Sequence, residues 1–558
     1  MAHIITSGLP GLVVPPRSGN AYEWLTSNPY SVSPSAPALY RLDGKVTPRA
    51  DVERLAGQIA FFLRETLGLV DGDRVALISP NTTMYQPVFL GLVRAGVTAV
   101  PLNPIYSPEE LAHPLTDSDI VAVLVHPVAL QTVHAAMDLT RRKKTTLNGA
   151  PAVWLVNDTD ALATAPSGER DLRTALSHEL PTVNIPKPAA REAVIVYSSG
   201  TSGKPKGVRL SHYNLIAGTD SIPKTDPADV NSNHIAMGVL PMFHIFGLNL
   251  LLMTAFLVGM PVVVVPRFEI EIFCAAVQRF RATMALVVPP MVLLLARSPV
   301  VSKYDLSSLR CAISGAAPLS VELGSEAERR LPTLRVTQGY GLSETSPVVT
   351  IAPSTEYHEH RGTCGRTAAG VEVRLVDEEH GDVAHMQGED GRRGELWVRG
   401  PNVMMGYLNN RAATEDCLTP DGWFKTGDIA LMRKGYFYIV DRKKELIKYK
   451  GFQVPPAELE SLINGHPAVF DVAVVGVHDR EQATELPRAY CVPRKFVPSK
   501  ATEQQRAEFE RDVTNWVAER VANYKKLRGG VVATDQIPKS AAGKILRRVL
   551  RDHANGAK

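Results

Sequence analysis

The sequence predicts an α/β protein, with a large N-terminal domain of two βα-rich subdomains plus a small β-rich subdomain, followed by a small α+β C-terminal domain. Short apolar runs such as RVALIS, VTAVPL and IVAVLV alternate with helical patterns, and the same rhythm returns after residue 190. Strands separated by single helices indicate βαβ units and a parallel sheet. In the second round, Ser211 is expected to cap the helix that follows the strands.

The sequence pattern changes in the C-terminal part of the chain. After residue 360, strand-like segments such as VEVRLV, GELWV and YFYIV lie between glycines, which indicates the small β-rich subdomain. The charged stretch DRKKELIKYK starts at Asp441, and further strand-like and helical segments follow it. We therefore expect a boundary at Asp441, with one domain over residues 1–440 and another over residues 441–558.

Composition narrows the possible functions. The 558 residues are 45% apolar and 21% charged, as in a globular protein with more than one core. A net charge of +4 is too small for this length to indicate a nucleic-acid partner. The cysteines contain no CxxC pair, which disfavours a structural zinc site and a disulfide framework alike. A reducing, cytoplasmic location fits this pattern best.

We expect no targeting or membrane segment in this sequence. Its N-terminus lacks the basic and apolar regions of a secretory signal, and its last residues are not the peroxisomal Ser-Lys-Leu. The stretch from Leu248 to Val265 is uncharged, but Gly259 and Pro261 divide it into a helix-like and a strand-like half. We therefore expect a buried helix and strand there, and no transmembrane segment.

The segment YSSGTSGKPKG, residues 197–207, combines hydroxyls, glycines and lysines directly after the apolar run Val194–Val196. It does not match a Walker A loop, because Pro205 disfavours a helical conformation at Lys204. Backbone amides, hydroxyls and lysines in such a loop can bind the phosphates of a nucleotide. A mobile surface linker has the same composition, so both interpretations stay open on this segment alone.

Longer motifs make the first interpretation specific. YSSGTSGKPKGV, QGYGLSETSP, WFKTGDIA, DRKKELIKYKGFQVPPAELE and PKSAAGKILRR follow one another along the chain. With these motifs in this order, the chain resembles the acyl-adenylate-forming superfamily of acyl-CoA synthetases, luciferases and peptide-synthetase adenylation domains. Segments such as PMFHIFGLN and KYDLSSLRCAISGAAPLS are most similar to the 4-coumarate:CoA ligase branch. The resemblance implies an ATP-dependent acyl-CoA ligase, an AMP-forming acid–thiol ligase.

The resemblance implies a reaction in two steps. An aryl or medium-chain carboxylic acid attacks the α-phosphate of ATP, which gives an acyl-AMP and pyrophosphate, and coenzyme A (CoA) then takes the acyl group as a thioester. Because the first step brings two anions together, the site needs cations and oriented donors. Mg²⁺ fits this need, since it favours oxygen ligands and retains several waters, so that one carboxylate beside the phosphates suffices.

By resemblance, most of the site binds the nucleotide. Glu344 corresponds to the family's magnesium ligand, and Ser343 keeps the hydroxyl of the threonine that many relatives have there. Asp428, with Arg442 nearby, corresponds to the aspartate that binds the ribose, although out of context a turn after Gly427 explains it better. The phosphate loop comprises Ser198, Ser199, Gly200, Thr201, Ser202, Gly203 and Lys206. The candidates around the adenine are Ala316, Ala317, Gln338, Gly339, Tyr340 and Gly341.

The resemblance gives two lysines different steps. Lys544 reaches the carboxylate and the α-phosphate during adenylation, although the residues after it also describe a basic amphipathic helix. The family's behaviour implies a mobile C-terminal domain that swings about a hinge near Asp441–Lys444 and brings Lys448 and Gln453 in for thioester formation. A charged linker helix is the alternative for this segment. The other cofactor-binding candidates are Lys444 and, along the pantetheine channel, Lys450, Gly451 and Phe452.

The acid pocket departs from the plant pattern. His244 resembles the gate between acid pocket and thiol tunnel, although a histidine in an apolar stretch is often an ordinary core residue. Phe246 replaces a common tyrosine, and Leu250 a common serine. A buried unpaired hydroxyl costs about 1 to 3 kcal/mol, so acids without a phenol should be preferred over 4-coumarate. The predicted walls are Phe246, Leu250, Gly315, Gly339, Pro347 and Val348.

Three alternative functions stay open. A luciferase-like oxygenase uses the same adenylation apparatus. A stand-alone enzyme could load a carrier protein in trans, because few residues follow Lys544. A binding protein with an inactive site is disfavoured, because both lysines, Glu344 and the glycine loop are present. A nucleic-acid-binding protein is also disfavoured, because the sequence has no stripe of basic residues interleaved with aromatic ones.

Overall fold

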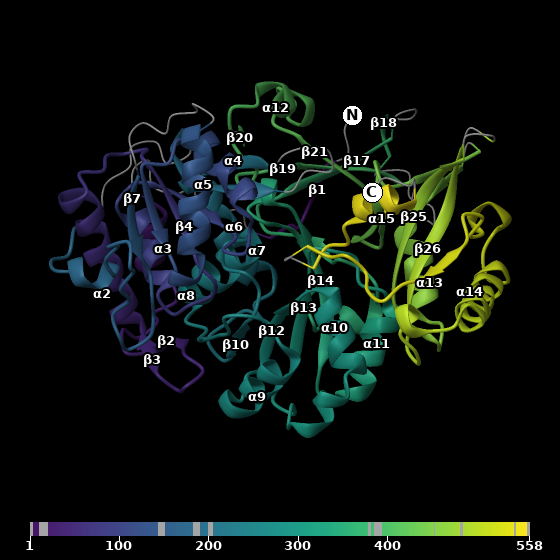
Figure 1. The fold of residues 1–558 in the computed structure, drawn as a ribbon. Coiled ribbons are helices and arrows are strands. Elements are labelled where there is room, and N and C mark those ends of the chain that lie inside the picture. The colour runs from purple at the N-terminus through teal and green to yellow at the C-terminus, as the bar shows by residue number, and fades with distance from the viewer. Residues whose placement is uncertain are drawn as a thin grey trace.

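The computed structural model describes residues 4–9, 20–142, 151–181, 190–198, 205–377, 381–383, 393–450, 452–479, 482, 484–540 and 543–554, and the following statements refer to these residues. Figure 1 shows two helix-covered sheets side by side, a β-rich layer next to them, and the C-terminal strands and helices at one end of the molecule. This arrangement confirms the predicted α/β architecture.

The first sheet has the strand order β20-β9-β8-β5-β4-β6-β7. Its parallel strands are β4 (Arg74–Ile78), β5 (Thr98–Leu102), β6 (Ala122–Val125), β7 (Ala152–Leu155) and β8 (Glu192–Ser198). The antiparallel strands β9 (Lys206–Ser211) and β20 (Gly406–Tyr407) extend one edge. The accompanying helices are α2 (Arg49–Phe61), α3 (Tyr85–Arg94), α4 (Pro108–Asp117), α5 (Leu130–Arg142) and α6 (His212–Thr225). Ser211 caps α6 as predicted, because its hydroxyl accepts from the Asn214 amide.

The second sheet has the order β16-β15-β14-β13-β12-β10-β11-β2-β3. Parallel pairing joins β2 (Pro37–Tyr40), β11 (Val262–Val264), β10 (Ala236–Gly238), β12 (Met284–Val287), β13 (Cys311–Ser314) and β14 (Arg335–Gly341). The antiparallel edge strands are β3 (Val46–Pro48), β15 (Val348–Ile351) and β16 (Arg366–Thr367). The helices are α1 (Ala21–Thr26), α7 (Ile245–Gly247), α8 (Ala255–Val258), α9 (Ile270–Phe280), α10 (Pro289–Arg297) and α11 (Val321–Arg330).

The uncharged stretch from Leu248 to Val265 forms a buried helix and strand, as expected. The helical part ends at Gly259, whose φ of 73° is a left-handed conformation that glycine adopts without strain, and β11 follows. None of the described helices is long and apolar enough to cross a membrane.

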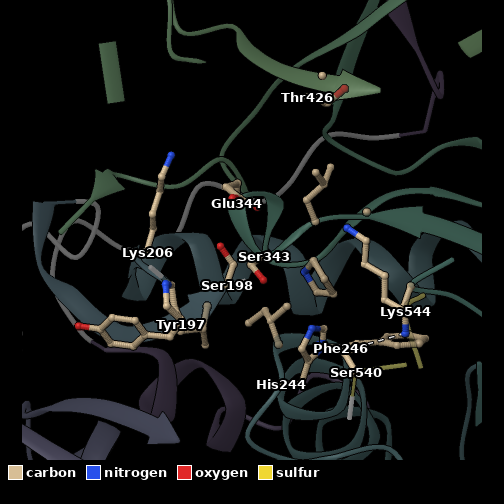
Figure 2. A pocket seen from close by; sticks show the side chains of 18 of the residues that line it. Tyr197, Ser198, Lys206, His244, Phe246, Ser343, Glu344, Thr426, Ser540 and Lys544 are labelled. Carbon is tan, nitrogen blue, oxygen red and sulfur yellow. Dashed lines mark hydrogen bonds between the residues drawn. The ribbon is translucent and has the colours of Figure 1, made fainter. Parts of the chain in front are cut away.

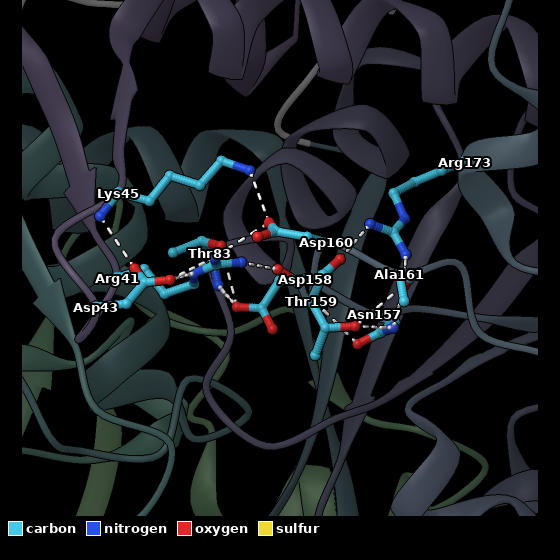
Figure 3. Close-up of polar contacts among 10 residues, drawn as sticks. All are labelled: Arg41, Asp43, Lys45, Thr83, Asn157, Asp158, Thr159, Asp160, Ala161 and Arg173. Carbon is cyan, nitrogen blue, oxygen red and sulfur yellow. Dashed lines mark hydrogen bonds and ion pairs between the residues drawn. The ribbon is translucent and has the colours of Figure 1, made fainter.

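A polar network joins the two βα-rich subdomains (Figure 3). Arg41 and Lys45, on the hairpin between β2 and β3, form ion pairs of 3.1 and 3.0 Å with Asp160. Asp160 lies in the segment after β7, and the neighbouring Asp158 accepts from the amide of Thr83 at 2.8 Å. Exposed ion pairs contribute little individually, so this network fixes the orientation of the hairpin more than it stabilises the fold.

The β-rich layer is an antiparallel sheet that follows the order β1-β17-β19-β21-β22, with β18 on its side. The strands are β1 (Ile5–Thr6), β17 (Glu372–Asp377), β18 (Gly381–Asp382), β19 (Gly394–Arg399), β21 (Phe424–Arg433) and β22 (Tyr436–Arg442). The helix α12 (Arg411–Cys417) precedes β21. The pairing of β21 with β22 brings Asp428 directly opposite Arg442.

The residues after β22 build a separate core. The hairpin β23 (Ile447–Tyr449) and β24 (Phe452–Val454) precedes a sheet of β25 (Val469–Asp479), β26 (Thr484–Pro493) and β27 (Val531–Ala533). The helices are α13 (Pro456–Asn464), α14 (Glu503–Ala518) and α15 (Arg547–Ala554). Buried residues such as Ile447, Leu459 and Val513 pack together there and not with the larger core of the preceding sheets.

Candidate active site

A cavity of about 1930 Å³ lies where the two parallel sheets, the β-rich layer and the C-terminal segments meet. The carboxyl ends of β8, β13 and β14 open into it, at Ser198, Gly315 and Gly341. Ligands of α/β proteins bind in such a place. In Figure 2, the side chains of Ser198, Ser343 and Lys544 surround this space together with Lys206, Glu344, His244 and Phe246.

The structure brings most of the predicted site residues to this one cavity. Those that line it are Ser198, Lys206, His244, Phe246, Leu250, Gly315, Ala316, Gly339, Tyr340, Gly341, Ser343, Glu344, Pro347, Val348, Arg442, Lys444, Lys448 and Lys544. The predicted residues Ser199, Gly200, Thr201, Ser202, Gly203 and Gly451, and the side chain of Gln453, lie outside the described residues.

Five other candidates do not line the cavity. Asp428 lies directly behind its wall, and Gln338 supports the wall, because its side-chain oxygen accepts from the Leu319 amide at 2.9 Å. Ala317, Lys450 and Phe452 are not among the residues that line the cavity, although Ala317 directly follows the lining residue Ala316. Phe452 is 53% exposed and stacks on Tyr524 at 4.5 Å.

A buried polar cluster of Tyr340, Asp428 and Arg442 lies beside the cavity. The Tyr340 hydroxyl donates to Oδ2 of Asp428 at 2.6 Å, and Nε of Arg442 pairs with Oδ1 at 3.0 Å. Burial, and then the Asp428 charge, raise the pKa of Tyr340 well above its usual value. The same carboxylate raises the pKa of Arg442. The cluster therefore holds a neutral phenol and a permanent cation beside the cavity.

Lys544 approaches the cavity on a tight hairpin. The Ser540 amide donates to the Lys544 carbonyl at 2.8 Å, and the Lys544 amide donates to the Ser540 hydroxyl at 3.1 Å. Gly543 has a φ of 77°, and a Cβ on it would lie 2.7 Å from the Val288 side chain. Only glycine fits this close approach without strain, so the hairpin rests directly on the N-terminal sheets. Burial, followed by the Arg442 charge, lowers the pKa of Lys544.

The apolar side of the cavity contains His244 and Phe246. Nδ1 of His244 accepts from the Phe246 amide at 3.3 Å, and this bond places the proton of a neutral ring on Nε2. Burial lowers the pKa of His244 to about 4, so the ring is neutral at physiological pH. The Phe246 ring lies against Gly315, where an added Cβ would be only 2.9 Å from Cε1.

Sequence reasoning missed the environment of Glu344. The Tyr407 hydroxyl donates to Oε1 of Glu344 at 2.8 Å, and Nζ of Lys206 lies 4.9 Å from the centre of the Tyr407 ring. Tyr407 stands on the edge strand β20, and its segment, GYLNN, carries no signal of its own. Apolar side chains that also went unnoticed line the cavity further on, namely Ile222, Val230, Ile313 and Ile351.

The donor set fits a magnesium ion that is held mainly by a substrate. Among the described residues, no group of three or more His, Cys, Asp or Glu side chains could hold a metal alone. Oε1 of Glu344 binds Tyr407, while Oε2 has no hydrogen-bond partner among the described residues. One free carboxylate oxygen at the cavity suffices for Mg²⁺ when a substrate's phosphates and waters supply the other ligands.

Comparison with known proteins identifies the family. The family model for the AMP-binding enzyme matches residues 30–408, and the one for the AMP-binding enzyme C-terminal domain matches residues 458–544. A probable 4-coumarate–CoA ligase 1 from Dictyostelium discoideum is 38% identical, over 87% of this chain and 86% of its own. The 4-coumarate–CoA ligase 1 of Arabidopsis thaliana is 35% identical, over 99% and 96%.

A solved structure gives the same result. ATP-bound MatB from Rhodopseudomonas palustris is similar with a TM-score of 0.80 at 27% identity, over 97% of this chain and 99% of that chain. The predicted superfamily is therefore confirmed. Two family models in the expected order, with relatives 35% and 38% identical over most of both chains, show that the chain belongs to the AMP-binding enzyme family, as an AMP-forming acid–thiol ligase.

Proposed function

We propose that this ligase converts an apolar aryl or medium-chain carboxylic acid into its CoA thioester through an acyl-AMP. The observation that carries the proposal is the shared cavity. A phosphate-side group of Ser198, Ser343 and Glu344 and an apolar pocket around Phe246 open into it, and Lys544 lines the same cavity. A carboxylate bound against Phe246 would thus have the Lys544 ammonium available as it meets the α-phosphate.

The nucleotide side has the donors that the first step needs. Ser198, at the end of β8, and Lys206, at the start of β9, flank the glycine loop and would bind the β- and γ-phosphates. Ser343 would donate to the α-phosphate. Asp428, which Tyr340 and Arg442 hold just behind the cavity wall, would accept from the ribose hydroxyls once these two side chains shift to admit the nucleotide. Oriented donors and cations of this kind stabilise the charge that develops during phosphoryl transfer.

Glu344 would hold Mg²⁺ through its free oxygen, and the ion would neutralise part of the phosphate charge when bound. The acid carboxylate then attacks the α-phosphorus, the bond to the β-phosphate oxygen breaks, and pyrophosphate leaves. Lys544 compensates the charge of the two anions as they meet. Because Lys544 is half-buried, its ammonium acts in surroundings where charge interactions are strong.

The second step requires a different arrangement of the C-terminal domain. We place its boundary at residues 441–558 and its hinge near Asp441–Lys444, since β22 ends at Arg442 and a separate core follows. In the described arrangement Lys544 is half-buried and Lys448 is exposed, and both line the cavity. A swing about the hinge would withdraw Lys544 and bring in Lys448 and Gln453, with Lys450, Gly451 and Phe452 along the pantetheine channel.

In this second step the CoA sulfur attacks the acyl carbon and AMP leaves. His244 lines the cavity next to Phe246, and this position is compatible with a role as the gate. With Nδ1 occupied by the Phe246 amide, Nε2 is a donor, so His244 would not take the thiol proton. Its neutral ring would orient the reacting groups without adding charge.

The pocket composition supports acids without a phenolic hydroxyl. Phe246 and Leu250 present no hydrogen-bond partner, and Ile222, Val230 and Ile313 continue the apolar lining. A buried phenol without a partner would lose about 1 to 3 kcal/mol.

A cytoplasmic location also stays part of the proposal, supported by the unpaired state of the cysteines.

The test is pyrophosphate release from ATP and Mg²⁺ with an acid panel, with and without CoA. We expect cinnamate and hexanoate to give a higher kcat/KM than 4-coumarate, and a thioester to form only with CoA. A clear preference for 4-coumarate would contradict the substrate proposal. Pyrophosphate release that leads to light emission with luciferin, or to acylation of a carrier protein but not of CoA, would contradict the proposed acceptor.

A further inference from the structure

A short segment later in the sequence, residues 402–408, holds Glu344 in place, and we call this segment the strap. At one end, Nδ2 of Asn402 donates to the carbonyl oxygens of Thr345 and Val348, each at 2.9 Å. The Met404 amide donates to the carbonyl of Glu344 itself, also at 2.9 Å. The strap therefore fixes the backbone of Glu344 and of the residues after it.

The other end of the strap pairs with the strand that leaves the glycine loop. The Met405 amide donates to the Arg209 carbonyl at 2.9 Å, and the Leu408 amide donates to the Gly207 carbonyl at 2.8 Å. This pairing places Tyr407 beside Val208 on β9, whose first residue is Lys206. The strap thus connects Glu344 mechanically to the base of the predicted phosphate loop.

Tyr407 is where the two ends meet. Its hydroxyl binds Oε1 of Glu344 at 2.8 Å, and its ring face lies under the Lys206 ammonium at 4.9 Å. Lys206 and Glu344, both among the described residues, form no ion pair with each other. The aromatic ring contacts the Lys206 ammonium, and the hydroxyl binds one oxygen of the Glu344 carboxylate. The two charges therefore do not pair with and neutralise each other.

We propose that Tyr407 is a positioning residue for adenylation. Its hydroxyl engages Oε1 of Glu344 and leaves Oε2 to hold a metal, while its ring holds Lys206 apart from the carboxylate, so the ammonium remains available for phosphate. This inference rests on the proposed role of Glu344 as the Mg²⁺ ligand. Groups that orient a metal ligand typically matter 10- to 100-fold in metal affinity or activity.

Tyr407→Phe removes the hydroxyl and keeps the ring. We expect the Mg²⁺ concentration for half-maximal pyrophosphate release to rise about 10-fold or more, while thioester formation from synthetic acyl-AMP and CoA stays unchanged. The second readout needs no turnover. Mn²⁺ binding in the presence of a non-hydrolysable ATP analogue, followed by the electron paramagnetic resonance signal of free Mn²⁺, should weaken by a similar factor.

A matched control is available in the same protein. The Tyr436 hydroxyl donates to Oε2 of Glu356 at 2.6 Å, and neither residue lines the cavity. Tyr436→Phe therefore removes the same kind of bond without touching the site, and its Mn²⁺ affinity should equal that of the unmodified protein. Thermal melts in which both variants have the same Tm as the unmodified protein would show that folding is preserved.

Glu344→Gln separates the failure of this inference from that of the proposed function. If Glu344 binds the metal, Glu344→Gln weakens Mn²⁺ binding, and adding Tyr407→Phe changes it little more, since the two residues act as one unit. If Glu344→Gln leaves Mn²⁺ binding intact, the proposed metal ligand is wrong. If Glu344→Gln weakens binding but Tyr407→Phe does not, the metal ligand stands and the positioning role of Tyr407 is overturned.

Discussion

Nη1 of Arg297, at the end of α10, donates to the carbonyl oxygen of Phe470, at the start of β25, at 2.5 Å. The same guanidinium donates to the carbonyls of Val469 and Asn464, each at 3.1 Å, and pairs with Glu326 at 2.9 Å. Its side chain is 2% exposed. Arg297, a residue on α10 with a buried side chain, thus binds the C-terminal domain in the arrangement that places Lys544 at the cavity.

Arg297→Met should release this arrangement, because it keeps the apolar stem and removes every donor. A hydrogen bond to a charged group contributes about 1.5 to 3 kcal/mol, and each 1.4 kcal/mol is about tenfold in an equilibrium constant. We expect adenylation in a single turnover to slow by about tenfold or more. Thioester formation from synthetic acyl-AMP should be unchanged or faster, since in the proposed mechanism that step uses the other arrangement of the C-terminal domain.

Arg330→Met is the control for Arg297→Met. Arg330 donates to the carbonyl of Ala296 at 3.0 Å and to the hydroxyl of Ser302 at 2.9 Å, so both of these contacts join helices that precede the C-terminal segments. It should leave the ratio of the two half-reactions unchanged. Equal slowing of both half-reactions in Arg297→Met would mean that Arg297 contributes to general stability and not to the domain arrangement.

Lys544→Ala should slow adenylation and spare thioester formation, as we expect for Arg297→Met, but the effect on adenylation should be larger. Loss of one donor to a transition state reduces turnover by about 10²-fold or more, so pyrophosphate release should fall by that factor. The variant should still convert acyl-AMP and CoA to the thioester. Lys539→Ala is the matched control, because Lys539 lies on the same hairpin but pairs with Asp471 at 2.5 Å, away from the cavity. A similar loss in both variants would contradict the role of Lys544.

The sequence predicted those parts of the fold that depend on local pattern. Alternating apolar runs and amphipathic helices are readable one element at a time, so the βα units were found, and so was Ser211 as the cap of α6. Pairing partners are not local. The strand β1, at Ile5–Thr6, joins β17 across the length of the N-terminal domain, and β2 and β3 belong to the second sheet although they precede the first. No nearby residue specifies these partners.

The same distinction explains the site. Glu344, Asp428 and Lys544 stand in motifs with recognisable wording, and the structure gathers two of them around one cavity and puts Asp428 just behind its wall. Tyr407 was missed because it lies on an edge strand of two residues and reaches Glu344 only after the chain has folded. Arg297 was missed for the same reason, since all its partners are distant in sequence or are backbone carbonyls without a side-chain signal.

The titration of Lys544 gives a pH dependence. Burial and the Arg442 charge lower its pKa below the ordinary 10.5, so the folded protein loses this proton at a lower pH than the unfolded chain does. In the proposed mechanism adenylation uses the ammonium, so kcat/KM for ATP, which reports the free enzyme, should fall as the pH rises through this lowered pKa. The decline should start below the range in which an exposed lysine titrates.

Lys544→Arg tests this assignment, since a guanidinium stays protonated throughout the accessible range. Its residual pyrophosphate exchange, measured from neutral to alkaline pH, should lack the decline. If the decline persists in Lys544→Arg at the same pH, another group causes it, and the ionisation of Lys544 does not limit adenylation.

Gly315 lies directly against the Phe246 ring and thereby limits the space of the proposed acid pocket. In Gly315→Ala, the new Cβ would lie 2.9 Å from Cε1 and 3.0 Å from Cζ of Phe246, which forces the ring to move. Overpacking of this kind costs about 1 to 3 kcal/mol, so kcat/KM for cinnamate should fall about tenfold while KM for ATP stays the same. Initial rates over a range of cinnamate and ATP concentrations measure both values.

The second substitution Phe246→Leu should restore much of the loss in Gly315→Ala, because the shorter side chain vacates the place of the ring. Residues in direct contact couple in this way, whereas independent ones add. Gly324→Ala is the control, since a Cβ there meets Tyr357 at 3.6 Å, an ordinary contact outside the cavity. If the losses of Gly315→Ala and Phe246→Leu simply add, the glycine acts elsewhere, and the ring of Phe246 is not the wall that limits the acid.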